Sequence, residues 1–503
     1  MSAQQELLAY ISLAREKKFS DEAIRAALQG AGWSKKEILH ALYPDVLGQK
    51  NPSKSLPPAI IIISILLFLL LGGVSAYGLY RYQTNPPATE TPAPEGNTIP
   101  TPSIPPDAGL SPTASPSEDA SKSAAIQLSP SVSFAHNGLG FDLFKELLKT
   151  DKDANVIISP TSIALALSMT YNGASESTKL AMAKTLKISA IDVKSLNEGN
   201  AALIKFLSNP DPQVTLSIAN SIWTKKGMTF LQPFLTTNST SYNAYIQSID
   251  FTLPTAVDTI NAWVSKNTKG KIPTIVENPI DPSIVMYLIN AIYFYGTWTH
   301  EFDPMLTEMK PFTLSTNAKI QHLLMKQERK DFLYQETNSF QGVLLPYGKN
   351  KRLSMVIMLP KIPLSSFLTQ LTQSTWNSWM KSYAEMEGTV LLPKFKIEYQ
   401  SSLKNSFLSL GMVQPFSSQT ADFTLMRTQK DLFISDIMHK TYIDVNEKGT
   451  EAAAVTSVMV QITSVNPAKK TFYMEVNKPF FFAIADSQSG EILFMGVINN
   501  PIK

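Results

Sequence analysis

The most uniform apolar stretch of the chain lies near its N-terminus. From Ser55 to Tyr80 there are 26 residues without a formal charge, and those from Ala59 to Leu71 are almost all Ile, Leu or Phe. A helix needs about 20 apolar residues to cross the hydrocarbon core of a bilayer. The pattern therefore predicts one transmembrane helix over residues 56–80.

The charges on the two sides of this run are asymmetric. Eight Lys and Arg residues precede it, whereas only Arg81 follows it before Lys122. Because cytoplasmic flanks carry the excess of positive charge, we expect a single-pass membrane protein with a cytoplasmic N-terminus and an extracellular remainder. A cleaved signal peptide, cut near Ala76, is the alternative. The stretch of about 55 residues ahead of the apolar run is far longer than such signals use.

Residues 1–50 show the apolar spacing of short amphipathic helices. Leu7 and Ile11 begin one stripe, Ile24 and Leu28 belong to a second, and Ser34 has capping-box spacing before a third. The segments around Phe19 and Trp33 resemble those of ubiquitin-associated-type three-helix modules. A small all-helical cytoplasmic cap for the membrane anchor is the simpler interpretation, and we favour it.

Residues 81–127 have no apolar periodicity. They are rich in Pro, Ser, Thr and Ala, and 11 of the 33 prolines fall between Arg81 and Pro130. Such a segment cannot bury enough apolar surface to fold, so we expect a disordered linker. At about 3.1 Å per residue it would reach on the order of 100 Å from the membrane.

Residues 128–503 mix helical and strand periods, which indicates one large α+β domain. Near its start a short apolar strand ends at Ile158, Ser159 is a natural N-cap, Pro160 suits the first helical position, and Gly173 suits the C-terminal cap. Near its end, residues 442–446 read as a strand, and residues 480–484 and 492–498 read as a hairpin.

Between that last strand and the hairpin lies a segment of about 30 residues, 447–476, with no regular pattern of its own. Such a loop inside a compact domain is normally functional or disordered. Its first half is small and poor in charge, and from Val455 onward it gains β-branched residues. This composition indicates an exposed segment that is able to enter a sheet, which a plain flexible linker does not explain.

Composition and charge exclude several classes of function. The net charge of +3 gives no reason to expect a nucleic-acid partner, and the absence of Cys excludes disulfides, thiol catalysis and Cys-type zinc sites. The five His residues form no zinc motif, and no serine-hydrolase elbow or phosphate-binding loop occurs. A carboxylate pair assembled by folding stays open. We expect a monomer that is not an enzyme and holds no metal or cofactor.

The strings of the large domain resemble, in order, those of the serpins, a family of protease inhibitors. The resemblance covers residues 128–503. Its segments are Asn155–Ser162, Asn220–Trp223, Leu288–Trp298, Leu391–Phe395, Asp444–Ala454, Asn477–Phe482 and Leu493–Val497. One such string would carry little weight, whereas this number in the right order is specific.

The resemblance implies a fold and a mechanism. The fold has three β-sheets, about nine helices and an exposed reactive-centre loop. The mechanism is irreversible suicide-substrate inhibition of serine proteases. The protease cleaves the loop, and at the acyl-enzyme stage the cleaved loop inserts as a new strand into the main sheet. Serpin loop insertion is a known example of strand addition to a sheet. Inhibition of cysteine proteases, or a serpin-fold binding or structural protein that traps nothing, are the alternatives.

The resemblance also assigns residues of the loop. The hinge comprises Glu447, Gly449, Thr450, Glu451, Ala452, Ala453 and Ala454. Because side chains alternate across a strand, Thr450, Ala452 and Ala454 would enter the sheet on one uncharged face. This composition favours an inhibitor, and replacing Thr450 with Arg should convert the inhibitor into a substrate.

The usual family loop length places the scissile bond at Thr463-Ser464. A small β-branched residue there suits a shallow apolar pocket, so we expect an elastase-like or subtilisin-like target. The loop is about five residues longer than in well-known inhibitors. Cleavage at Met459-Val460, at Ile462-Thr463 or after Lys469 or Lys470 therefore stays open.

Other residues match positions where the family's main sheet opens. Ser159, Ser162, Asn290 and His439 match the shutter, and Trp298 matches the breach, where the hinge first enters. For His439 an ordinary buried histidine is the alternative. Glu447 and Lys394 match a pair that bridges the top of the sheet, for which a surface ion pair would contribute only ~0–1 kcal/mol.

Overall fold

The computed structural model describes residues 126–208, 210–450 and 471–502, together with Leu7, Ile11, Ile24 and Leu28. The chain divides into two compact units, residues 1–119 and 120–503. In the first unit the four described residues are helical and buried, as the apolar stripes predict. The predicted transmembrane helix, and the predicted linker up to residue 125, lie outside the described residues. Within the described parts, no helix is both long and apolar enough to cross a bilayer.

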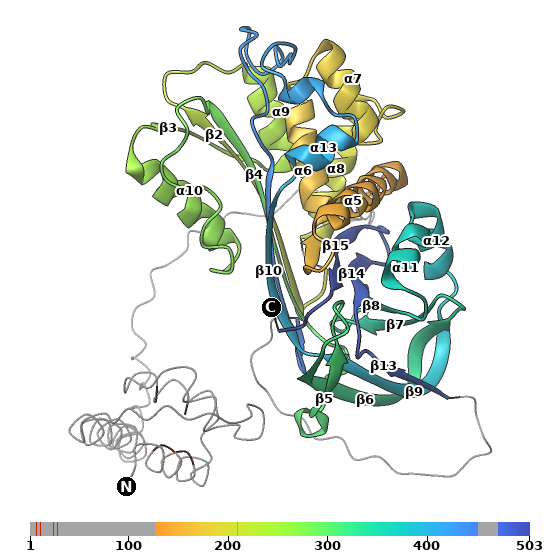
Figure 1. Ribbon diagram of the computed structural model, residues 1–503. Coiled ribbons are helices and arrows are strands. Elements are labelled where there is room, and N and C mark those ends of the chain that lie inside the picture. The colour runs from red at the N-terminus through yellow and green to blue at the C-terminus, as the bar shows by residue number, and fades with distance from the viewer. Residues whose placement is uncertain are drawn as a thin grey trace, which may run out of the picture. The chain divides into compact units, whose positions relative to one another are not determined.

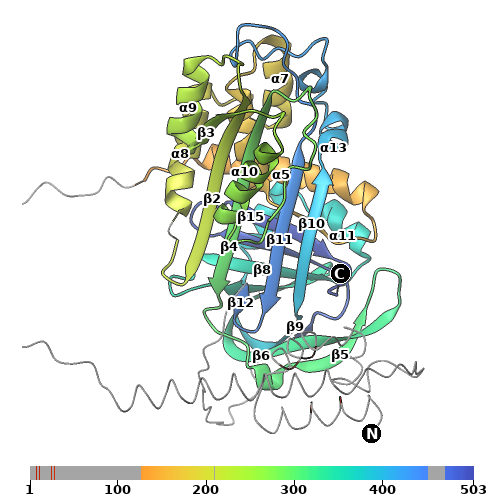
Figure 2. The same ribbon diagram turned by 90° about the vertical axis from the view of Figure 1, so that its left-hand side faces the viewer.

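The second unit is built around a six-stranded sheet, seen face-on in Figure 2. All its neighbouring strands are antiparallel except the pair β2 and β3. In spatial order the strands are β10 (Phe395–Ser402), β11 (Met438–Asn446), β12 (Gly449–Thr450), β4 (Met286–Thr297), β2 (Val214–Lys225) and β3 (Tyr245–Ile249).

Helices cover both faces of this sheet (Figure 1). Helix α6 (Pro160–Tyr171) packs behind β4 and is buried nearly all round, as its apolar sequence predicts. Helix α10 (Pro254–Asn267) lies on the opposite face, where Ile260 and Val264 contact a separate apolar cluster with Trp223 of β2. The sheet is therefore apolar on both sides.

A second sheet holds nine strands. Its path runs through β1 (Val156–Ile158), β15 (Ile492–Ile498), β14 (Phe480–Asp486), β8 (Leu353–Pro360), β7 (Phe340–Pro346), β6 (Lys319–Glu336), β9 (Ala384–Pro393) and β13 (Phe472–Glu475), and β5 (Glu308–Thr313) pairs with β6.

The strands account for the three sheets that the family resemblance implies, but two of these sheets are joined in the nine-stranded sheet. The 18-residue strand β6 pairs with β5 near its N-terminal end, with β7 near its C-terminal end, and with β9 from Leu324 to Tyr334. Its register with β9 shifts between Arg329 and Phe332. A bulge of this kind bends a strand, so the single strand β6 belongs to both of the joined sheets.

Nine α-helices, α5 to α13, occur in the described parts of residues 126–502, which agrees with the expected number and with an α+β class. Besides α6 and α10 they are α5 (Pro130–Thr150), α7 (Glu176–Thr185), α8 (Val193–Leu207), α9 (Gln232–Tyr242), α11 (Leu364–Gln370), α12 (Gln373–Met380) and α13 (Lys404–Ser409). Two short 3₁₀ turns, η1 (Pro304–Leu306) and η2 (Gln414–Phe416), complete them.

The local predictions at the start of the domain are confirmed, with one correction. Ser159 caps α6 and its Oγ accepts a hydrogen bond from the backbone N–H of Ser162. The helix ends at Tyr171, however, and Asn172 is its C-terminal cap, so the cap predicted at Gly173 was wrong. Gly173 is required by packing instead, because a Cβ there would lie 2.0 Å from Cγ of Met426. The C-terminal hairpin is present as β14 and β15, and both strands are fully buried.

Candidate functional site at the opening of the six-stranded sheet

The centre of the six-stranded sheet is held together by a strand of only two residues. Gly449 pairs with Asn446 of β11 and Thr297 of β4, and Thr450 pairs with Val445 and Gly296 of the same two strands. In the described part of the chain, β11 and β4 are not hydrogen-bonded to each other, and β12 is the strand that joins them (Figure 2). The first two residues after the β11 turn thus lie between the two central strands.

Gly449 fits there because the backbones approach closely. A Cβ at this position would lie 2.0 Å from the carbonyl oxygen of Gly296 and 2.8 Å from Cα of Thr297. No side chain is accommodated at such distances, so glycine is required while β12 stays paired. The resemblance assigned Gly449 to the hinge, and the structure gives a steric reason for a glycine at this position.

Thr450 faces the interior and is almost fully buried. Its hydroxyl lies 2.7 Å from the hydroxyl of Tyr347, which is also buried. Burial raises the pKa of Tyr347 well above its ordinary value, so the phenol stays protonated and is able to share its hydrogen with Thr450. This contact fixes the inward orientation that the alternation of side chains predicts for Thr450.

Trp298 supports the turn between β11 and β12. Its indole Nε1–H donates to the carbonyl of Asn446 over 2.9 Å, and its backbone N–H donates to the carbonyl of Lys448 over 2.8 Å. The indole stacks on Tyr347 with ring centroids 4.4 Å apart. Trp298 therefore lies where β12 enters the sheet, in contact with the same tyrosine that holds Thr450.

Glu447 anchors the other side of this turn. Its carboxylate is 2.9 Å from Nζ of Lys394, and it accepts a hydrogen bond from the Thr307 hydroxyl over 3.0 Å. The Glu447 side chain is 13% exposed and that of Lys394 is 34% exposed, so solvent partly screens the pair.

A second set of polar contacts lies farther from β12, near the middle of the sheet. The Ser162 hydroxyl of α6 donates to Oδ1 of Asn290 in β4, and Nδ2 of Asn290 donates to Oδ1 of Asn220 in β2 over 2.6 Å. Nδ2 of Asn220 then donates to the backbone carbonyl of Tyr242 over 2.7 Å. These bonds tie β4 to its neighbour β2 and to the helices behind the sheet.

His439 joins this set from the side of β11. Its Nε2 accepts a hydrogen bond from the backbone N–H of Ser159 over 3.1 Å, and Ser159 is linked to Ser162 through the helix cap. Burial lowers the pKa of His439 to about 4, so the ring is neutral at physiological pH. The structure thus places Ser159, Ser162, Asn290 and His439 in one chain of hydrogen bonds, in which the start of α6 links the two central strands from behind the sheet.

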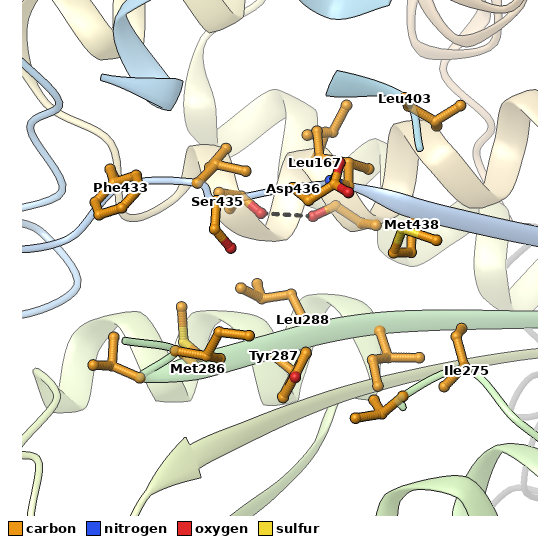
Figure 3. Close-up of a pocket in the computed structure, with 18 of the residues that line it drawn as sticks. Leu167, Ile275, Met286, Tyr287, Leu288, Leu403, Phe433, Ser435, Asp436 and Met438 are labelled. Carbon is orange, nitrogen blue, oxygen red and sulfur yellow. Dashed lines mark hydrogen bonds between the residues drawn. The ribbon is translucent and has the colours of Figure 1, made fainter. Parts of the chain in front are cut away.

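A cavity of about 460 Å³ lies beyond this chain of hydrogen bonds, on the side away from β12, between β4 and the segment that leads into β11. Figure 3 shows Tyr287 and Leu288 of β4 on one side of it and Phe433 and Asp436 on the other. Leu167 of α6 lines it from behind. At the ends of β4 and β11 far from β12, the two central strands are therefore separated by a space with both apolar and polar lining residues.

The structure adds site residues that the sequence did not single out. Asn220 belongs to one of the motifs that resemble serpins, but the sequence assigned it no role. Its contact with Asn290 depends on the pairing of β2 with β4, which places the two residues opposite each other. Tyr347 and Tyr242 had no sequence signal. The remaining predicted hinge residues, 451–454, and the predicted scissile pair, 463–464, lie outside the described residues.

Comparisons with known proteins agree with this geometry. The sequence model of the family described as serpin (serine protease inhibitor) matches residues 134–501. The leukocyte elastase inhibitor of Bos taurus is 35% identical over 382 residues, which are 74% of this chain and 99% of that protein.

Solved structures give the same result. The native-state crystal structure of the thermophilic serpin tengpin is 34% identical with a TM-score of 0.66, over 76% of this chain and 96% of tengpin. The complex of thyroxine-binding globulin with thyroxine is 26% identical with a TM-score of 0.66, over 74% of this chain and 99% of that one. Nearly the whole of each relative thus matches the compact unit 120–503, which identifies this unit as an independently folding domain. The chain belongs to the serpin family.

Proposed function

We propose that this protein is an irreversible, suicide-substrate inhibitor of serine proteases. The observation that carries the proposal is the pairing of β12 with both β11 and β4. The start of the loop is thus already paired between the two strands that must separate to admit the remainder of the loop. The family match supports protease inhibition in general.

The covalent step is that of ordinary acyl transfer, stopped halfway. The hydroxyl oxygen of the protease's catalytic serine attacks the carbonyl carbon of Thr463, the Thr463–Ser464 peptide bond breaks, and the new amine of Ser464 leaves with a proton from the catalytic histidine. An ester then joins Thr463 to the protease. Insertion of the freed loop carries this ester along the sheet before water hydrolyses it. From Gly449 to Thr463 there are 14 residue steps. At about 3.4 Å per step, insertion would move the ester by roughly 50 Å along the sheet.

The register of β12 predicts where each loop residue would go. If the pairing continues without a bulge, Ala452 comes between Ile443 and Phe294, and Ala454 between Thr441 and Ile292. Thr456 would then lie between His439 and Asn290, the two residues that face each other across the opening. Each of these loop residues would point to the same side as Thr450.

Further along, the same register brings Val458 opposite Leu288 and Val460 opposite Met286, beside the cavity. The inward side chains of the loop thus change from small to larger apolar ones where they come beside the cavity. Burying two Val side chains there would stabilise the inserted state by about 1.5–3 kcal/mol each. This agreement of loop composition with cavity position supports an inhibitor over a protein that is merely cleaved.

The target we propose is an elastase-like or subtilisin-like serine protease, cleaved at Thr463-Ser464. The small β-branched Thr463 supports a shallow apolar primary pocket, and the bovine relative carries elastase in its name. We further propose that residues 56–80 anchor the protein in a membrane, with residues 1–50 in the cytoplasm and the serpin domain outside the cell. The apolar run and the asymmetry of Lys and Arg around it support this orientation.

A serpin-fold binding protein is the second candidate, since a related structure is that of a thyroxine-binding globulin. The hinge, which has no Pro and no charge on its inward face, and the register described above favour an inhibitor. A binding protein has no need of a loop that fits the interior of its main sheet.

The test is to mix the domain, residues 120–503, with a panel of serine and cysteine proteases. Denaturing gels and mass spectrometry would follow the products. We expect a complex with an elastase-like or subtilisin-like enzyme that survives denaturation, and a released peptide that begins at Ser464. Thr450→Arg should be cleaved without forming the complex, because a charge would have to be buried, whereas the exposed control Thr255→Arg should trap normally. Cleavage of the wild type without any complex, across the panel, would refute inhibition.

A further inference from the structure

An exposed apolar patch lies at the end of the domain where β12 enters the six-stranded sheet. Two of its side chains belong to the short turn η1 and one each to β5 and β6: Met305, Leu306, Met309 and Leu323. Their exposed fractions are 87%, 42%, 45% and 38%. Figure 2 shows β5 and β6 at the same end of the domain as β12. We call these four residues the hinge-side patch.

The pairing of β5 with β6 brings the patch together. Met309 lies directly opposite Leu323, and opposite residues of an antiparallel pair point to the same face with Cβ atoms about 5 Å apart. Because η1 ends at Leu306 and β5 begins at Glu308, Met305 and Leu306 lie next to this pair. The four side chains therefore form one apolar area on the surface.

The face of β6 that carries Leu323 is covered farther along the strand. Met325 and Gln327, the next two residues on that face, are buried. The segment that leads into η1 covers Gln327, whose Nε2 donates to the carbonyls of His300 and Glu301 over 2.7 and 3.1 Å. Leu323 lies just beyond this cover. An apolar area left open beside a covered one indicates a place for a partner.

No single sign of charge surrounds the patch. Three ion pairs lie around it at 3.4, 2.9 and 2.7 Å, namely Glu308 with Lys310, Glu447 with Lys394 and Glu328 with Lys326. The other exposed charged residues beside η1 and the β5–β6 turn have both signs: Glu301, Asp303 and Lys319. A partner of the patch is therefore recognised by apolar contact rather than by net charge.

The patch adjoins the point where the loop begins. The hydroxyl of Thr307, between η1 and β5, donates to the carboxylate of Glu447 over 3.0 Å. The backbone N–H of Lys394 donates to the carbonyl of Leu323 over 3.0 Å, and the Lys394 side chain pairs with Glu447. The start of the loop is thus bonded to the same residues that frame the patch.

The other end of the loop is also within reach. Phe472 pairs with Gly388 of β9, and Gly388 pairs with Arg329 of β6. Leu323 is six residues from Arg329 along β6. At about 4.8 Å between strands and 3.4 Å per residue, Leu323 is roughly 20–25 Å from Phe472. The proposed scissile bond is eight residues before Phe472, and at about 3.4 Å per residue it is at most roughly 30 Å from it.

We propose that the hinge-side patch is a second contact for the target protease, outside the protease's active site. A globular protease of about 220 residues has a radius of gyration of roughly 17 Å, so its body extends well beyond the bond it holds. The loop is tethered at both ends and keeps that body over this part of the surface. An apolar area of the protease beside its substrate cleft would rest on Met309 and Leu323 while the loop occupies the cleft.

This contact would act on recognition, not on trapping. It would raise the rate of association and select among proteases that share the same primary pocket. The inference rests on the proposed function, because the identity of the partner comes from there.

The test compares second-order rate constants of association between the domain 120–503 and a protease that the wild type traps. Met309→Gln with Leu323→Gln keeps the length of both side chains and makes their ends polar. We expect association to be about five- to thirty-fold slower. The number of inhibitor molecules consumed per trapped protease should stay unchanged, because the loop and the six-stranded sheet are untouched.

A matched control replaces two exposed apolar residues at a distance from the loop. Leu180 of α7 and Val413 beside η2 are 73% and 51% exposed, on elements that pack against each other. In Figure 1, α7 is at the end of the domain opposite β5. Leu180→Gln with Val413→Gln should therefore associate as the wild type does.

Two further measurements keep the result independent of one variant. Met305→Gln changes the most exposed side chain of the patch, which folding does not require, and should slow association at least about two-fold. With a protease whose catalytic serine is replaced by alanine, the dissociation constant should rise by the same factor as the association rate falls. Equal rates for the wild type and both folded variants would overturn the proposal. Faster association of the variants would show that the patch holds the uncleaved loop instead, and would overturn it as well.

Failure of the proposed function would be recognised separately. If the wild type is cleaved but not trapped, inhibition is refuted. The ratio of kcat/KM for loop cleavage between the wild type and the patch variants then decides the contact, and a ratio of about one would refute it. If no protease of the panel binds or cleaves the wild type, both proposals fail.

Discussion

The contact between Thr450 and Tyr347 gives the sharpest test of whether the hinge is docked in the sheet before any protease acts. Thr450→Val keeps the shape of the side chain and removes its hydroxyl. The buried phenol of Tyr347, whose partner is 2.7 Å away, would then lose that bond. An unsatisfied buried polar group costs about 1–3 kcal/mol, whereas removing both partners is nearly neutral. We therefore expect Thr450→Val to lower the free energy of unfolding by about 1–3 kcal/mol and to cost much less in a Tyr347→Phe background.

The assay is a double-mutant cycle, with urea unfolding of the domain 120–503 measured for the wild type, both single variants and the double variant. A coupling of about 1–2 kcal/mol is expected for two groups in direct contact. Tyr383→Phe is the control, because the Tyr383 hydroxyl is buried without a partner in the described structure, and its removal should be neutral or stabilising. If Thr450→Val cost the same in both backgrounds, β12 would not be docked in solution, and the observation that carries the proposed function would fail.

Of three further predictions, two concern the same site and the third a buried ion pair of the nine-stranded sheet. The folded-state pKa of His439, about 4, lies below its ordinary value of about 6.5, so the unfolded chain binds the proton more tightly. The free energy of unfolding should therefore fall by up to about 3 kcal/mol as pH drops from 6.5 to 4. Urea midpoints measured across this range should show the loss, and His439→Gln should flatten the pH dependence. Gly449→Ala should expel β12, since its Cβ would overlap the Gly296 carbonyl, and hydrogen exchange at the end of β4 should then become faster; unchanged protection there would contradict the packing argument. Arg352→Met leaves Asp486 charged and buried without its partner, so it should cost about 3–5 kcal/mol in urea unfolding, whereas Lys194→Met, at an exposed pair, should change stability by less than about 1 kcal/mol.

Some features of the site are encoded locally and are therefore visible in the sequence. Ser159 and Pro160 specify the start of a helix through their own backbone preferences, and the apolar run before them specifies a buried strand. The uncharged inward face of the hinge is likewise a matter of composition. The cap at Gly173 was wrongly predicted because the reason for that glycine, the side chain of Met426, lies some 250 positions away in the chain.

The partners across the opening were decided by the tertiary structure alone. Asn290 and Ser162 are 128 positions apart, and His439 and Ser159 are 280 apart. Periodicity tells which face of a strand is buried, but not which strand lies opposite or in what register. The pairing of β12 on both sides and the cavity at the far end of β4 are both properties of that register. The sequence by itself determined which residues are able to enter a sheet; the packing of distant strands around α6 decided where the sheet is open to receive them.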